Sequence, residues 1–483
     1  MHQQHLPAES RLLVTAGEAF RRGSWYHQPW AVAAVRSPLN NNSTGDRLTT
    51  RQSRRGFLQT SAASAALLAS GVHRQLGAQE SNSPNEKLNI GIIGVGGRGA
   101  ANTGGVAGEN IAALCDIDAN HLAGAKKRFP KATPYRDWRK VMDDKTLDAV
   151  VISTADHTHA PAAIAAMNSG KHVYCEKPLA HTVEEARLMR QTYDKAKMKV
   201  ATQMGTQIHA TDNYRRVVEL IRGGAIGKVT HAHVWCGRTI SAVNPNAPVQ
   251  QPPSHIDWDL WLGPASDRPF RAGIMPGNLT WNRWWDFGNG VLGDMGSHLI
   301  DLAYWALELK NPTAVAAEGP EVNEHSNPSW LIVHWDHPPT DKRDAVKVSW
   351  YHHNKRPASP AGIDLSKWHI GVMFEGTQGQ LVADYGKRVL LPAEEFADYK
   401  PPEPSIAKSL GHYREWTHAA KTGGETLCNF EYSGALIEHN LLGNVAYRVG
   451  ERLEWDADKF EVTNNSDAER YIKKEYRKGW EIA

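Results

Sequence analysis

The stretch LNIGIIGVGGRGAANTGG, residues 88–105, decides the fold. Its apolar run ends in GVGGRG, which puts Gly94, Gly96 and Gly99 in a G-x-G-x-x-G pattern directly after a predicted strand. The first glycine permits a tight turn, the second lets a pyrophosphate approach the backbone, and the third lets the following helix pack on the strand. N–H groups at the helix N-terminus then face the anion. The stretch therefore predicts a dinucleotide-binding domain.

An acidic residue at the next strand end indicates which dinucleotide binds. Asp116 lies 116 − 94 = 22 positions after the first glycine, where a carboxylate would hold the adenosine ribose diol. The same carboxylate would repel a 2′-phosphate, so we expect NAD(H) rather than NADP(H). Gly97 and Arg98, inside the turn, are expected to contact the cofactor too. The alternative is a glycine turn with a solvated aspartate at the strand end.

Apolar runs alternate with amphipathic stretches through the whole of residues 88–205. LNIGIIG, IAALCD, DAVVIST, HVYCEKP and KVATQMG are continuous enough in aliphatic residues to be strands buried on both faces of a parallel sheet. Helical stretches such as DANHLAGAKKRF and HAPAAIAAMNSG separate them. The pattern predicts an α/β Rossmann domain with a doubly wound sheet over 88–205, after a polar linker at 81–87.

The carboxyl edge of such a sheet is where ligands bind. Pro178 cannot continue a central strand, so Lys177 is predicted to project from this edge toward the reactive end of the cofactor. Thr182 and Glu185 form a T-x-x-E capping box for the next helix, and a solvated loop pair is the alternative for Glu176 and Lys177. Further side chains expected to line the cofactor site at this edge are Thr154, His157, His159 and Glu176. Capping or packing is an equal alternative for the two histidines.

The pattern changes after about residue 206. The amphipathic stretch NYRRVVELIRGG is followed by THAHVWCG, AVKVSWYHH, GVMFEGTQGQLVADY and KRVLLP, which are strand-like and have no helices between them. We therefore expect a second α/β domain over 206–483 with a mostly antiparallel sheet.

Within the second domain, GDMGSHLIDLAYWAL predicts a helix that carries Asp294 and His298 at i and i+4, on one face. Oxidation of an alcohol needs a base for the hydroxyl proton, and imidazole suits that near neutral pH. The Lys177 ammonium can stabilise the negative charge on the same oxygen. Asp294 would fix the substrate or orient the imidazole. A structural His–Asp pair is the alternative.

Gln207 and Trp284 are further candidates for substrate contact, since an indole ring can stack on a sugar face. Packing in the core or at an interface is the alternative for Trp284 and its neighbours. His352 and His353 lack a third partner at metal-ligand spacing, so the sequence predicts no metal.

These motifs together resemble the glucose-fructose oxidoreductase and inositol dehydrogenase (Gfo/Idh/MocA) family. The resemblance rests on GVGGRG at 94–99, STADHTHAP at 153–161, CEKP at 175–178 and GDMGSHLIDLAYW at 293–305, in the family's order. It implies a Rossmann domain followed by an α/β domain whose large open sheet often forms an oligomer interface, and thus a homo-oligomer. It also implies oxidation or reduction of a secondary hydroxyl of a sugar, cyclitol or related polyol with the lysine of the EKP motif. Gln207 and His209 stand where the family often has Arg or Asn.

Composition excludes some other classes of function. With 55 basic and 52 acidic residues the formal net charge is only +3, so no strong positive field attracts nucleic acid. No apolar run is long enough to span a bilayer. The four cysteines are widely spaced, which indicates free thiols rather than a disulfide framework.

The N-terminal region resembles a twin-arginine export signal. SRRGFL at 53–58 is followed by the weakly apolar QTSAASAALLASGV, and small residues end the segment 53–80. Residues 1–52 are either an unstructured extension or the product of a misassigned start, and a buried Ala-rich helix is the alternative for the signal. Export to the periplasm would favour tight retention of NAD, recycled in place by a second sugar or by the same substrate. The latter would make a redox-neutral glycosidase, and a non-catalytic sugar-binding protein is a third possibility.

Overall fold

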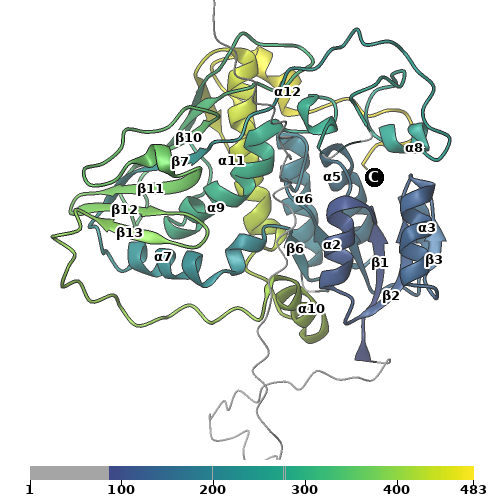
Figure 1. Ribbon diagram of the computed structural model, residues 1–483, viewed down its shortest axis with the longest axis horizontal. Helices are drawn as coiled ribbons and strands as arrows, with labels where there is room; N and C mark the ends of the chain where they lie inside the picture. The colour runs from purple at the N-terminus through teal and green to yellow at the C-terminus, as the bar shows by residue number, and fades with distance from the viewer. Residues whose placement is uncertain (1–85, 198, 276, 278, 483) are drawn as a thin grey trace, which may run out of the picture. The chain divides into compact units, whose positions relative to one another are not determined.

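A six-stranded parallel sheet is formed by residues 89–204 in the computed structural model, which describes residues 86–197, 199–275, 277 and 279–482 (Figure 1). The predicted extension, the export signal and most of the linker lie outside these residues. The strand order β3-β2-β1-β4-β5-β6 is that of a dinucleotide-binding Rossmann sheet. The strands are β1 (Asn89–Ile93), β2 (Asn110–Cys115), β3 (Thr133–Tyr135), β4 (Ala149–Ile152), β5 (His172–Cys175) and β6 (Thr202–Met204).

Helices connect these strands in the predicted alternation. They are α2 (Gly97–Gly105), α3 (Ala119–Arg128), α4 (Trp138–Asp143), α5 (Asp156–Asn168) and α6 (Val183–Ala196). The predicted capping box of α6 is confirmed, because the Thr182 hydroxyl accepts from the Glu185 N–H and the Glu185 carboxylate accepts from the Thr182 N–H. This cap fixes where the chain leaves the carboxyl edge of β5 and enters the helix.

A nine-stranded mixed sheet forms the second half, in the order β13-β12-β11-β7-β10-β9-β8-β14-β15. Strands β7 and β10 pair in parallel and the other pairs are antiparallel, so the predicted fold class is confirmed. The strands are β7 (Val229–Cys236), β8 (Ala314–Glu318), β9 (Ile332–His337), β10 (Val346–His352), β11 (Ile370–Gly376), β12 (Gly379–Ala383), β13 (Arg388–Leu391), β14 (Leu453–Asp456) and β15 (Glu461–Val462).

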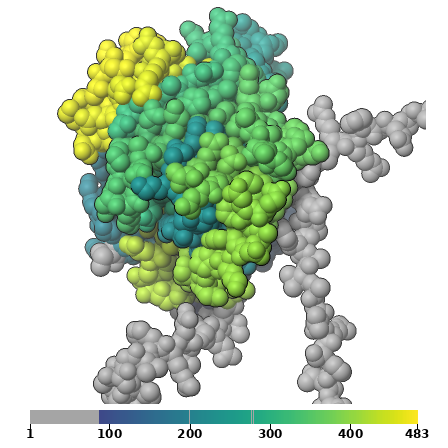
Figure 2. All heavy atoms as spheres, turned by 90° about the vertical axis from the view of Figure 1, so that its left-hand side faces the viewer, coloured from purple at the N-terminus to yellow at the C-terminus, as the bar shows by residue number. Residues whose placement is uncertain are grey.

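One face of the mixed sheet is covered by helices, and α9 and α11 lie between the two sheets (Figure 1). Val234, Val348 and Phe374 point into this core and are fully buried. Figure 2 looks at the molecule from the side of the mixed sheet, whose segments make up most of that surface. The helices of this half are α7 (Asp212–Arg222), α8 (Trp258–Leu262), α9 (Ser297–Ala306), α10 (His412–Thr422), α11 (Phe430–Val449) and α12 (Glu469–Ile472).

Helix α10 returns to the first half of the chain. Its Trp416 and Ala419 are buried in one cluster with Ile90 and Ile92 of β1, so residues far beyond 206 complete the Rossmann core. Within the described residues, no helix has both the length and the apolar character that crossing a membrane requires.

Candidate active site

The glycine turn between β1 and α2 has the shape that the sequence predicts. Gly94 has φ +81°, and a Cβ on Gly99 would lie 1.8 Å from the Gly94 carbonyl oxygen. Gly97 also has a positive φ, +48°, and a Cβ there would meet no atom within 4 Å. Gly94 and Gly99 are therefore required by the fold itself, whereas Gly97 borders open space at the N-terminus of α2.

Asp116 supports this turn from the end of β2. Its carboxylate accepts hydrogen bonds from the N–H groups of Val95 at 2.9 Å, Gly96 at 3.3 Å and Asp118 at 2.9 Å. Burial raises the pKa of the Asp116 carboxyl, although the hydrogen bonds from Asp118 and Val95 oppose that rise. Besides the predicted ribose contact, Asp116 thus helps to position the glycine turn.

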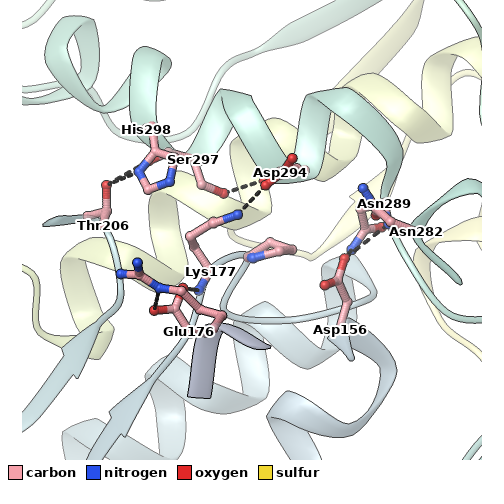
Figure 3. Close-up of polar contacts among 12 residues, drawn as sticks. Asp156, Glu176, Lys177, Thr206, Asn282, Asn289, Asp294, Ser297 and His298 are labelled. Carbon is pink, nitrogen blue, oxygen red and sulfur yellow. Dashed lines mark hydrogen bonds and ion pairs between the residues drawn. The ribbon is translucent and has the colours of Figure 1, made fainter. Parts of the chain in front are cut away.

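The segment after β5 carries the residue on which the proposed chemistry depends. Lys177 reaches from the carboxyl edge of the Rossmann sheet and donates a hydrogen bond to Oδ1 of Asp294, in the second half of the chain (Figure 3). Only 14% of the Lys177 side chain and 4% of the Asp294 side chain are exposed, so solvent weakens their attraction little. The structure brings the two predicted residues together.

The Glu176 carboxylate accepts four hydrogen bonds near the glycine turn. Its Oε1 accepts from Arg98 Nε at 2.9 Å, Asn102 Nδ2 at 3.0 Å and Gln207 Nε2 at 3.1 Å, and its Oε2 accepts from the Lys177 N–H at 3.3 Å. Burial alone would raise the pKa of Glu176, but the charges of Arg98 and Lys177 outweigh burial and lower it. The carboxylate is therefore ionised and ties α2 to the loop that carries Lys177.

Asp294 and His298 do not lie on one continuous α-helix, and that prediction is wrong. Asp294 lies in a π-helical turn, Leu292–Gly296, and His298 lies in the first turn of α9. The Asp294 carboxylate binds Lys177 and Arg238, and the imidazole instead bonds to a hydroxyl from another element. A π-turn re-aims side chains that i,i+4 spacing would stack.

His298 is held by Thr206, which follows β6. The Thr206 hydroxyl lies 3.2 Å from Nδ1 of His298, and the Tyr214 hydroxyl donates to the His298 carbonyl at 3.0 Å. Burial, reinforced by the charge of Lys177, lowers the pKa of His298 to about 3. The imidazole is therefore neutral near pH 7.

Two further polar residues belong to this site, and the sequence analysis missed both. Arg238 follows β7 and donates through Nη1 to Oδ2 of Asp294, so two cations share one carboxylate. Asp156, at the start of α5, accepts from the Asn289 N–H at 3.1 Å, and burial raises its pKa well above the usual value. Asp156 lies within the STADHTHAP motif and could have been named as a candidate from it. Nothing in the sequence near Arg238 indicates that it binds Asp294.

Three predicted contact residues are buried in packing roles. The ring nitrogens of His157 lie 3.3 Å and 3.0 Å from the Phe287 and Trp261 carbonyl oxygens, and those of His159 lie 2.7 Å and 3.1 Å from the Pro178 and Thr154 carbonyl oxygens. A neutral imidazole donates a hydrogen bond to one carbonyl of each pair. Both histidines are 1% exposed, so their rings pack behind the site and offer no nitrogen to a ligand. Trp284 is 2% exposed in an apolar cluster, which leaves no ring face for a sugar.

Comparison with known proteins agrees with this arrangement. The family described as "Oxidoreductase family, NAD-binding Rossmann fold" matches residues 88–204, and "Oxidoreductase family, C-terminal alpha/beta domain" matches residues 224–482. The chain belongs to the GFO/IDH/MocA oxidoreductase family. Residues 88–204 therefore form an NAD-binding domain, as the glycine turn predicted.

Curated relatives of this GFO/IDH/MocA chain include sugar and cyclitol dehydrogenases. It is 30% identical over 240 residues to levoglucosan dehydrogenase of Pseudarthrobacter phenanthrenivorans, covering 45% of this chain and 50% of the relative. It is 31% identical over 153 residues to inositol 2-dehydrogenase of Salmonella typhimurium, covering 30% and 45%. The chain thus spans about half the length of the curated relatives it matches.

Solved structures share the fold of this family member. GenD2 from gentamicin A biosynthesis, in complex with NAD, superposes with a TM-score of 0.53 at 19% identity and covers 78% of this chain and 99% of its own. An NAD-binding protein from Listeria innocua superposes with a TM-score of 0.53 at 17% identity and covers 76% and 97%.

Proposed function

We propose that the protein transfers a hydride between bound NAD(H) and a secondary hydroxyl or ketone of a sugar, cyclitol or related polyol. The observation that carries this proposal is the Lys177–Asp294 ion pair at the carboxyl edge of an NAD-binding sheet, with His298 of α9 beside it (Figure 3). The names of the levoglucosan and inositol dehydrogenases among the relatives support the substrate class.

The residues at the glycine turn fit NAD(H). The open space at Gly97 would admit the pyrophosphate, the N-terminus of α2 would face it, and Asp116 would bind the adenosine ribose. When bound, the nicotinamide ring supplies the hydride acceptor or donor. An ionised Asp116 disfavours a 2′-phosphate.

The side chains of this chain would handle the proton and the charge. The neutral imidazole of His298, held by Thr206 through Nδ1, would take the hydroxyl proton when the alcohol is oxidised. The Lys177 ammonium would donate a hydrogen bond to the substrate oxygen as negative charge develops on it. Asp294, ionised beside Lys177 and Arg238, would hold that ammonium in place.

A direct test uses the purified full chain. Bound nucleotide is released with acid and identified, and sugars, cyclitols and polyols are screened for NADH absorbance. The proposal expects one NAD(H) per chain and turnover of at least one polyol. A protein that neither contains nor binds NAD(H), and that produces no NADH with any compound, would overturn it.

A redox-neutral glycosidase is the second candidate function. The neutral imidazole of His298 and the ammonium of Lys177 would also suit a transient oxidation of the sugar followed by elimination of its substituent. The chain is 31% identical over 208 residues to a glycosyl hydrolase family 109 protein of Solibacter usitatus, covering 38% of this chain and 45% of that protein. Release of the aglycone from a glycoside without net NADH would favour this redox-neutral glycosidase.

We further propose that the protein is exported by the twin-arginine route to the periplasm and forms a homo-oligomer through its mixed sheet. Cell fractionation of the wild type and an Arg54→Lys, Arg55→Lys variant tests the first proposal. Light scattering on the purified protein tests the second.

A further inference from the structure

The outer face of the mixed sheet carries a histidine cluster that the proposed reaction does not use. His231 and His233 are two positions apart on β7 and therefore point to the same face. The register places Glu375 of β11 opposite His231, and Ser349 of β10 opposite His233. This face is opposite to the one that carries Val234 into the helix-covered core. Figure 2 views the molecule from this side.

Three of these side chains bring their possible ligand atoms close together. His231, His233 and Glu375 each offer one ligand atom, and the three atoms lie within 4.8 Å of one another. His233 Nε2 is 3.5 Å from Glu375 Oε1, and the two imidazole centroids are 3.7 Å apart. An ion would pull the three atoms together by a modest shift of side chains.

Neighbouring hydroxyls hold both rings from the other side. The Tyr351 hydroxyl is 3.1 Å from His233 Nδ1, and the Ser349 hydroxyl is 2.7 Å from His231 Nε2. Ser349 also lies 2.6 Å from Nδ1 of a further histidine, His334, on β9. Metal-bound histidines commonly make such outer hydrogen bonds, which fix the tautomer and the ring orientation.

A positively charged side chain lies near the cluster. Lys347 is on the same face, but it is 49% exposed and lies 4.0 Å from Asp336. Its charge is therefore partly compensated.

We propose that His231, His233 and Glu375 form a binding site for a divalent transition metal of the Zn²⁺ class. Two imidazoles and one carboxylate are ligands that Zn²⁺ takes, with a fourth position left for water, whereas Mg²⁺ and Ca²⁺ prefer an all-oxygen set. The ion would join β7 to β11 on the face of the sheet opposite the helix-covered core. The sequence analysis did not consider these three residues together. His231 and His233 are two positions apart in THAHVWCG, but Glu375 lies beside them only because β11 pairs with β7.

The test uses the full chain, without a polyhistidine tag and stripped with a chelator. Zn²⁺ is titrated by calorimetry, and bound zinc is then measured after gel filtration. Variants are Glu375→Gln, which alters a partly exposed side chain, and His233→Ala; the matched control is His418→Ala, an exposed histidine of α10. Circular dichroism melting of each variant checks that the fold is intact.

The proposal expects one Zn²⁺ per wild-type chain, an affinity at least about tenfold lower in Glu375→Gln and His233→Ala, and no change in His418→Ala or on addition of Mg²⁺. A wild-type chain that retains no Zn²⁺, or equal binding by Glu375→Gln and wild type, would overturn it. Because the readout is metal content, the result does not depend on the proposed hydride transfer.

Discussion

Lys177 and Asp294 form a hydrogen-bonded ion pair between the two halves of the chain, although 117 positions separate them. Lys177 comes from the edge of the NAD-binding sheet and Asp294 from a π-helical turn that leads into α9 and packs against α11. Because both side chains are buried, the pair defines where the ammonium points before substrate arrives. Rate enhancement by a preorganised charge depends on such prior placement.

Lys177→Met should lower kcat for polyol oxidation by about 100- to 1,000-fold, because it removes the donor to the developing oxyanion. NADH binding, followed by fluorescence titration, should change little. Lys421→Met is the matched control, since Lys421 pairs with Glu109 at the protein surface. Equal loss of activity in both variants would show that Lys177 has no special role.

Gly99→Ala should abolish NADH binding, because the new Cβ would lie 1.8 Å from the Gly94 carbonyl oxygen and would force the turn open. Gly104→Ala, later in α2, meets no atom within 4 Å and should be neutral or stabilising, by up to about 1 kcal/mol. Fluorescence titration with NADH and thermal melting distinguish the two. If Gly99→Ala bound NADH as tightly as wild type, the glycine turn would not be the cofactor site.

Arg238→Met should reduce kcat/KM by about 10- to 100-fold, since a charge-assisted hydrogen bond to Asp294 is worth about 1.5–3 kcal/mol. Arg238 and Lys177 both lower the pKa of Asp294, so loss of one cation should also move the acid limb of the pH–rate profile to higher pH. Arg238→Lys keeps the charge and should lie closer to wild type in both measurements. A pH profile unchanged in Arg238→Met would contradict this assignment.

The parallel sheet and the glycine turn were predictable because each depends on residues that are adjacent in the sequence. A strand appears as an apolar run such as NIGII, and the turn appears as closely spaced glycines directly after it. Lys177, Asp294 and His298 could be named as candidates from their motifs. Arg238 could not, because its partner is fixed by the π-turn and by the pairing of β7 with β10. The same π-turn broke the expected i,i+4 relation, and burial of His157 and Trp284 depends on tertiary packing that spacing does not reveal.

Acid should destabilise this protein well before its carboxylates titrate. Four histidines have a pKa of about 3, and burial is the main cause of the decrease in each. Protonation of any of them would place a positive charge in the interior of the protein. They are His157, His298, His352 and His412. In the unfolded chain each would have a pKa near 6.5. Between these two values the unfolded state binds protons that the native state does not, so the free energy of unfolding falls as pH decreases below about 6.5.

At pH 5.5 each of these histidines should remove about 1.3 kcal/mol, or about 5 kcal/mol for the four together, relative to neutral pH. Urea unfolding at pH 7.5, 6.5 and 5.5 measures the loss. His352→Gln keeps an acceptor for the indole N–H of Trp350, now 3.1 Å from His352 Nδ1, and removes one proton site, so its stability should depend less steeply on pH. Equal unfolding free energies at pH 7.5 and 5.5 would mean that the native and unfolded chains take up the same number of protons between these pH values, so burial would not lower the pKa of these imidazoles.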